Sequence, residues 1–266
     1  MEHASPGMSR QAGLLAVWLA VMAASPAGQA LPPRIAAGWQ AYVAAAEVRI
    51  TRERGQPIPG RPDVERGEIA VEQVRTPGPA GDLEVPDAGV HHWRGTVLVP
   101  GARLDDVVSR LEQEPPDTRQ EDVVTAAILE KRPGWLKVAI RVRRSLIVTA
   151  VFDTEHEVSF ERHGAGRASS WSTATKIVEV ADAGTPNERP KRPDEDRGLL
   201  WRWNAYWRYE QVERGVLVEC ESVTLSRPVP FVLRPVAGPI VGHVARESMD
   251  RTLAVFRERF RKEAGK

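Results

Sequence analysis

The chain has 266 residues, of which 42% are hydrophobic and 27% charged, and its formal net charge is +1. This apolar content excludes an intrinsically disordered chain, and the balanced charge offers no basic face for duplex nucleic acid. The single cysteine, Cys220, excludes an intramolecular disulfide and a zinc cluster built on cysteines. The length fits one large domain or two small ones.

The first thirty residues have the layout of a secretory signal peptide. Arg10 precedes an uninterrupted run of apolar and small residues at 12–24, and small residues follow at 25–30. A run of this length matches a signal sequence, whereas a membrane-spanning helix needs about 20 residues. A buried N-terminal helix is the alternative, and the start can be Met1 or Met8. We expect 1–30 to be removed, leaving a periplasmic or secreted single domain at 31–266 with no transmembrane segment.

The first part of the mature chain mixes helices and strands. Apolar residues recur at helical spacing in 34–50, which is also rich in alanine, and predict a helix. Segments 68–76 and 91–100 are typical of strands. A short helix follows directly after the second strand, because its apolar residues fall at i, i+3, i+4 and i+7. These residues are Leu104, Val107, Val108 and Leu111.

From residue 122 to 226 the pattern is that of long strands joined by short turns, which predicts an antiparallel sheet. An amphipathic helix at 243–262 is the large apolar helical face that can cover this sheet. We therefore expect an α+β fold, in which a curved antiparallel sheet wraps around a long C-terminal helix. The predicted strands are 123–130, 136–142, 145–160, 168–180, 199–211 and 215–226.

This order of elements resembles the START/polyketide-cyclase-like (SRPBCC) superfamily, the helix-grip fold. The segments that carry the resemblance are 91–93 with 97–101, 153–158, 200–208 and 218–222. The resemblance covers about residues 34–262 and points to secreted bacterial members of uncharacterised function. It implies a hydrophobic cavity between the sheet and the C-terminal helix. Because the superfamily includes lipid carriers, hormone receptors, cyclases and dioxygenase subunits, it implies no catalytic motif.

Tryptophan is unusually frequent, with 8 Trp against 3 Tyr and 5 Phe. In the strand 199–211, period two places four aromatic residues on one face. This face either lines a ligand cavity, where an indole offers flat apolar contact and one N–H donor, or forms ordinary core. The predicted ligand-binding residues are Trp171, Trp201, Trp203, Trp207 and Tyr209, with Met249, Leu253 and Phe256 of the C-terminal helix.

Polar residues on the same strands are candidates for an anchor. A two-residue turn at 213–214 predicts that Arg208 lies opposite Glu219. This pair belongs either to a solvated outer face or to the cavity, where Arg208 could hold a carboxylate or phosphate head group. If this were the inner face, the tryptophan assignment would reverse. Alternation places His156 opposite the carboxylate face of its strand, which makes it a third candidate anchor or an acid–base group.

No spacing in the sequence predicts a metal or cofactor site, and mid-strand Cys220 is expected to be a buried, inert thiol. We therefore expect an exported protein that binds a hydrophobic small molecule or lipid, with no cofactor and no nucleic acid partner. One alternative is a cyclase, dehydratase or hydrolase acting through His156 or the Arg208–Glu219 pair. Another is an envelope interaction module with a filled core. Protein partners are not indicated.

Overall fold

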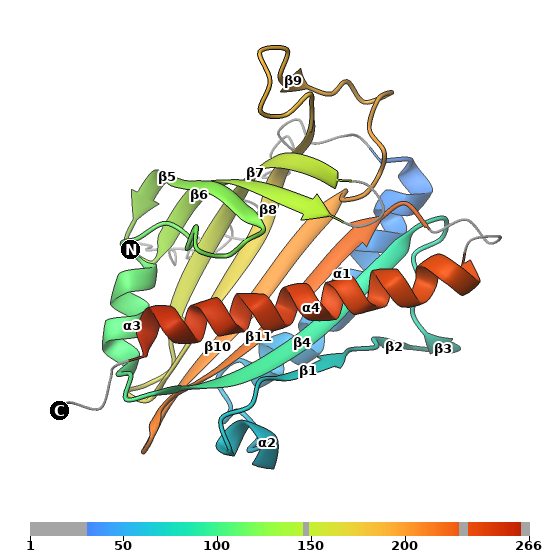
Figure 1. Cartoon of the computed structure of the whole chain (residues 1–266). Helices are drawn as coiled ribbons and strands as arrows, with labels where there is room; N and C mark the ends of the chain where they lie inside the picture. The colour runs from blue at the N-terminus through green and yellow to red at the C-terminus, as the bar shows by residue number, and fades with distance from the viewer. Residues whose placement is uncertain (1–30, 146–148, 229–233, 262–266) are drawn as a thin grey trace, which may run out of the picture.

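The computed structural model describes residues 31–145, 149–228 and 234–261, and a curved antiparallel sheet is its frame (Figure 1). The predicted signal peptide, 1–30, lies outside the described residues. The helices are α1 (Pro33–Glu53), α2 (Pro62–Glu65), α3 (Leu104–Leu111) and α4 (Arg234–Phe260). The strands are β1 (Ala70–Gln73), β2 (Pro77–Gly78), β3 (Gly81–Asp82), β4 (Gly89–Pro100), β5 (Val123–Arg132), β6 (Trp135–Ser145), β7 (Thr149–Arg162), β8 (Arg167–Ala181), β9 (Arg189–Pro190), β10 (Arg202–Val212) and β11 (Gly215–Ser226).

The main sheet has the order β1-β4-β11-β10-β8-β7-β6-β5, with β9 beside β8, while β2 and β3 form a separate hairpin. Every pairing in it is antiparallel. The strands β5 to β8 each pair with the next strand along the chain, as their short turns predict. The predicted fold class is therefore confirmed: an α+β helix-grip fold, with the sheet curved around α4.

Two helices are longer than the sequence predicts. α1 covers Pro33–Glu53 rather than 34–50, and α4 begins at Arg234 rather than at 243. The proline and glycine residues of 235–239 suggested a break before the helix. Backbone N–H groups in the first turn of a helix have no partner within the helix, so a proline, which lacks an N–H, is tolerated there. Pro235 is therefore compatible with a helix that begins at Arg234.

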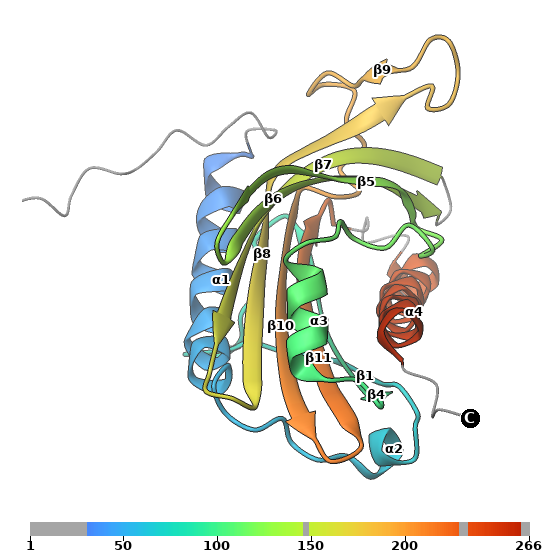
Figure 2. The ribbon, with the colours of Figure 1, turned by 90° about the vertical axis from the view of Figure 1, so that its left-hand side faces the viewer.

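The sheet has helices on both faces, as Figure 2 shows: α1 lies against the convex face and α3 and α4 lie within the concave side. On the concave side, valines of β4 and β11 pack with α3 and α4. On the convex side, α1 buries Ile35, Trp39, Tyr42, Ala46 and Ile50 against β11 and neighbouring segments. Each large apolar side chain buried in this way contributes about 1.5–3 kcal/mol. The sequence predicted only the helix on the concave side, the C-terminal helix α4.

Close approach of α4 to β4 fixes the position of that helix. Gly95 of β4 lies directly beneath it, and a Cβ built on Gly95 would stand 2.4 Å from Leu253 Cδ1 and 2.8 Å from Met249 Cγ. Leu253 is fully buried, so a side chain at residue 95 would force it or Met249 to shift. The absence of a side chain at residue 95 is therefore what allows α4 to lie on β4.

We expect Gly95→Ala to lower the free energy of unfolding by about 1–3 kcal/mol, because the added methyl overpacks the contact with α4. Gly166→Ala is the matched control, since a Cβ there would meet nothing within 4 Å. Urea unfolding of both variants measures the difference. Equal midpoints for the two variants would contradict this account of α4 docking.

Candidate functional site

A cavity of about 460 Å³ lies between α4 and the concave face of the sheet. Its described walls come from β4, β6, β7, β8, β10 and β11, from α4, and from the loop between α3 and β5. The volume falls within the range of about 300–1,000 Å³ that is usual for small-molecule pockets. The predicted place of a cavity, between sheet and C-terminal helix, matches the structure.

The cavity exists because the middle of the concave face carries small side chains. Ser172 of β8, Ala205 of β10 and Ser222 of β11 lie side by side in one row across the sheet. The next row holds the small residues Ser170 and Cys220 on either side of Trp207. Protein interiors normally leave few voids larger than a water molecule, and these short side chains cannot fill the space beneath α4. The half-exposed Ala205, on a strand in the middle of the sheet, faces this space.

Five of the predicted ligand-binding residues line the cavity: Trp203, Trp207, Tyr209, Met249 and Phe256. The rings of Trp207 and Phe256 stack with centroids 5.4 Å apart, and those of Tyr209 and Phe256 with centroids 6.2 Å apart. Sheet and helix therefore share one aromatic wall. This wall offers broad, flat apolar contact to a ligand.

Three predicted wall residues lie elsewhere. Trp171 packs with the α1 cluster on the convex face, with its ring edge-on to Tyr206 at 5.2 Å. Trp201 joins the same cluster, because it precedes β10 and the alternation of that strand does not extend to it. Leu253 is in the concave core, packed against β4 at Gly95, and not among the residues that line the cavity.

One end of the cavity carries a charged group that the sequence analysis missed. Arg144, near the end of β6, forms an ion pair with Asp122 at 2.9 Å and donates a hydrogen bond to Ser248 of α4 at 2.5 Å. Its guanidinium lies 5.6 Å from the centroid of the Trp203 ring. Burial lowers the pKa of Arg144, and Arg251 acts in the same direction, while Asp122 opposes both. An arginine nevertheless stays charged in a protein, so this part of the cavity wall carries a guanidinium, which is paired with the carboxylate of Asp122.

A signal for Arg144 is present in the sequence. Leu136, Val138, Ile140 and Val142 alternate along β6 and all line the cavity. Period two continues to Arg144, so the same alternation that predicts an inward apolar face also places one arginine on it. The strand predicted from the sequence, 136–142, ends two residues before this side chain, whereas β6 continues to Ser145.

His156 lies in the cavity wall, as its place on the inner side of its strand predicts. It is 2% exposed, its Nε2 is 3.1 Å from Thr154 Oγ1, and its Nδ1 is 3.3 Å from Ser172 Oγ. Its ring stands edge-on to Trp203, with centroids 4.9 Å apart. Burial lowers the pKa of His156 to about 4, so the imidazole is neutral at pH 7.

Cys220 is buried beside the same cavity, and burial raises the pKa of its thiol well above the ordinary value. Because the thiolate is the reactive form, a thiol in this state is a poor nucleophile. Within the described residues, no group of three or more His, Cys, Asp or Glu side chains could hold a metal ion.

The predicted pair of Arg208 and Glu219 exists, but in a different environment. The register places the two residues opposite each other, and Arg208 Nε donates to Glu219 Oε1 at 2.9 Å. Both side chains lie on the convex face beneath α1, 7% and 5% exposed, and Arg208 also donates to the carbonyl oxygen of Glu53. The pair is therefore neither solvated nor part of the cavity, and Arg208 is not available to a ligand there.

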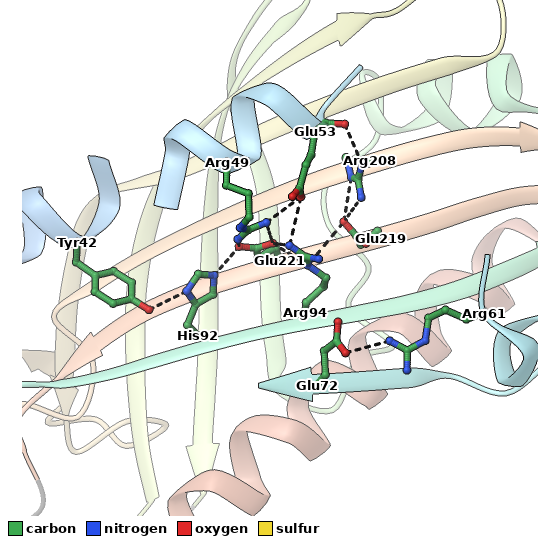
Figure 3. A network of polar contacts seen from close by, with 10 residues as sticks. All are labelled: Tyr42, Arg49, Glu53, Arg61, Glu72, His92, Arg94, Arg208, Glu219 and Glu221. Atoms are coloured by element: carbon green, nitrogen blue, oxygen red, sulfur yellow. Dashed lines mark hydrogen bonds and ion pairs between the residues drawn. The ribbon is translucent and has the colours of Figure 1, made fainter. Parts of the chain in front are cut away.

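Figure 3 shows that this pair belongs to a larger buried network between α1 and the sheet. Glu221 is at its centre and accepts hydrogen bonds from His92 at 2.5 Å, from Arg94 at 2.8 and 2.9 Å, and from Arg49 of α1. Tyr42 of α1 bonds the other ring nitrogen of His92 at 2.9 Å.

The network has matched charges: the guanidiniums of Arg49, Arg94 and Arg208 against the carboxylates of Glu53, Glu219 and Glu221. Buried charges are tolerated when they are paired and hydrogen-bonded. No net charge remains to attract a ligand, so we interpret the network as the connection that fixes α1 on the convex face.

Comparisons with solved structures find similar folds at low sequence identity. A STAR-related lipid transfer protein from Xanthomonas axonopodis is 14% identical, with a TM-score of 0.46 over 72% of this chain and 99% of that one. The lipid transfer and protein localization domain of human StarD13 is 13% identical, with a TM-score of 0.45 over 88% and 100% of the chains. The Zhui aromatase/cyclase from Streptomyces sp. R1128 is 14% identical, with a TM-score of 0.38 over 67% and 100% of the chains.

No protein-family model matches the chain, and no curated protein matches it. Among the described residues, no helix combines the length and the apolar character needed to cross a membrane.

We expect Glu221→Ala to lower the free energy of unfolding by about 3–5 kcal/mol, because it leaves buried guanidiniums without their carboxylate. The control is Glu68→Ala, since Glu68 is paired with Arg66 on the surface and both side chains are at least 60% exposed. An exposed pair contributes about 0–1 kcal/mol. Urea unfolding compares the two variants, and similar losses would argue against the network as the connection that holds α1.

The same network predicts how stability depends on pH. Burial raises the pKa of Glu221, but hydrogen bonds from His92 and Arg49 and the charge of Arg94 outweigh burial and lower it to about 2, against an ordinary 4.5. The stabilisation is thus complete above pH 4.5 and is lost as the pH falls toward 2. Over this window the wild-type protein should lose about 3 kcal/mol more than Glu221→Gln. Parallel urea-unfolding curves against pH would contradict this.

Proposed function

We propose that the protein is an exported binding protein that holds one amphipathic, lipid-like molecule in the cavity beneath α4. The observation that carries the proposal is an open cavity of about 460 Å³ with aromatic and aliphatic walls and a charged pair, Arg144 with Asp122, in its lining. The apolar part of the ligand would lie along the aromatic wall of Trp207 and Phe256. A polar head group would lie at Arg144 beside Trp203.

Burial of the apolar part supplies most of the affinity in this proposal. Each methylene removed from water contributes about 0.8 kcal/mol, so a tail of about ten methylenes contributes about 8 kcal/mol before the costs of association. A single hydrogen bond contributes about 1 kcal/mol net. The walls therefore determine whether a ligand binds, and the polar groups determine which ligand binds and in what orientation.

An enzyme on the same scaffold is favoured by one observation, the position of His156 beside Ser172 in the cavity wall. A serine nucleophile needs a base that is stabilised when it takes up a proton. His156 has a pKa of about 4 because of burial, and no described carboxylate hydrogen-bonds to it. This arrangement supports recognition better than proton transfer. The filled-core alternative is disfavoured by the open cavity itself.

The test is native mass spectrometry of the full-length gene product purified from its own envelope, followed by organic extraction. We expect a mass that lacks residues 1–30 and carries one bound apolar molecule. Ala205→Phe should abolish the bound mass, because the ring projects into the cavity from the middle of the sheet and blocks the ligand, whereas Ala127→Phe, at an exposed residue of β5, should retain it. Circular dichroism of both variants checks that they fold.

Two results would overturn the proposal separately. A bare mass that stays unchanged after incubation with a broad lipid panel would overturn the binding function. A mass that still includes residues 1–30 would overturn export and leave the binding function in place.

A further inference from the structure

A chain of hydrogen bonds runs through the cavity wall from β6 to β8. Thr154 Oγ1 bonds the carbonyl oxygen of Ile140 at 2.8 Å, His156 Nε2 lies 3.1 Å from Thr154 Oγ1, and Ser172 Oγ lies 3.3 Å from His156 Nδ1. Thr154 and His156 are each 2% exposed, whereas Ser172 is half-buried and lines the cavity. Ser172 is thus the member of the chain that a ligand can reach.

The direction of each hydrogen bond in the chain follows from the carbonyl oxygen of Ile140, at which the chain begins. A backbone carbonyl oxygen can only accept, so Thr154 must use its single hydroxyl hydrogen on Ile140. Toward His156 the same hydroxyl oxygen can then only accept. The hydrogen between Thr154 and His156 therefore belongs to Nε2 of the imidazole.

The protonation state of His156 then decides the direction of its hydrogen bond with Ser172. A neutral imidazole carries one N–H, so with Nε2 protonated Nδ1 presents a lone pair. Burial lowers the pKa of His156 to about 4, which keeps the ring neutral in solution near pH 7. Ser172 consequently donates its hydroxyl hydrogen to Nδ1. Its oxygen keeps lone pairs, and no hydrogen, for any other partner.

We infer that Ser172 Oγ forms a subsite that accepts a hydrogen bond from the bound ligand, and so selects a hydroxyl or N–H donor over a carbonyl or ether oxygen. The inference rests on the proposed binding function and names the ligand class more closely: an amphipathic molecule with a hydroxyl on its body. His156 and Arg144 both contact the ring of Trp203, so this hydroxyl lies near the charged end of the ligand.

The probes are hexadecanoic acid, its monohydroxy derivatives with the hydroxyl at successive carbons near the carboxylate, and the matching oxo acids. Isothermal titration of the mature protein should give a Kd that is roughly three- to tenfold lower for the best hydroxy acid than for hexadecanoic acid. The oxo acid at the same carbon should bind no more tightly than hexadecanoic acid. Ser172→Ala should abolish the preference.

Ser170→Ala is the matched control, because Ser170 lines the same cavity one row away and bonds Tyr209 at 3.0 Å, outside the chain of hydrogen bonds. It should keep the preference for the hydroxy acid. Circular dichroism and thermal unfolding of both serine variants show whether each retains its fold.

Thr154→Val tests the direction of these hydrogen bonds. Thr154 is a positioning residue, because it bonds His156 and does not reach the ligand. Without the threonine oxygen, Nε2 loses its acceptor, and the hydrogen can move to Nδ1 and donate to Ser172. The serine hydroxyl then points to the ligand, so the preference should reverse in favour of the oxo acid. A residue with only a structural role would weaken both acids alike.

The tautomer itself is measured by ¹⁵N NMR of the imidazole in the wild-type protein, which does not depend on any variant folding. A protonated Nε2 is expected, and a protonated Nδ1 overturns the inference. Equal affinity for the hydroxy and unsubstituted acids also overturns it, while leaving the binding function intact. If none of the acids binds, the proposed function fails for this ligand class, and the inference fails with it.

Discussion

The contact between α4 and β4 is the constraint on which the rest of the molecule depends. Gly95 lets the helix lie against one side of the sheet, where Leu253 and Met249 pack on β4. The remaining strands curve away from that contact and over the helix (Figure 2). Small side chains at Ser172 and Ala205 leave a cavity beneath this arch. The cavity thus follows from one tight contact on one side and short side chains on the other.

The two faces of the sheet lie in different environments, because helices cover both of them. On β10, Trp203 and Trp207 face the cavity, while Tyr206 and Arg208 face α1. Neighbouring residues in the sequence therefore belong to different parts of the molecule, the cavity wall and the attachment of α1. The large network of paired charges lies on the convex side, whereas the cavity on the concave side is lined mainly by apolar side chains, with the Arg144–Asp122 pair among its polar groups.

Much of the fold could be predicted from the sequence, because alternation and helical spacing are strong in the long elements. The strands β5 to β8, β10 and β11, the hairpin register at Arg208 and the C-terminal helix follow from these patterns. What covers each face is a tertiary property that one strand does not encode. A signal did exist in α1, where Tyr42, Arg49 and Glu53 share the apolar face of the helix and mark a polar partner on the sheet.

The candidate site was predicted less completely. Aromatic residues were recognisable by period two, but Trp201 lies before its strand begins and Trp171 has the opposite orientation. Arg144 was missed because the strand was ended too early. The small residues that create the cavity have no distinctive pattern. An alanine or serine in a strand indicates neither core nor cavity until its neighbours across the sheet are known.

The position of the cavity has a consequence for the folded state. A ligand beneath α4 would touch the same aromatic residues that pack the helix onto the sheet, so it would act as a removable part of the hydrophobic core. Occupancy and folding are then linked by mass action, because a molecule that binds only the native state shifts the folding equilibrium toward it. The melting temperature would then rise when a ligand binds and fall when it dissociates, so it would report how much of the protein is occupied.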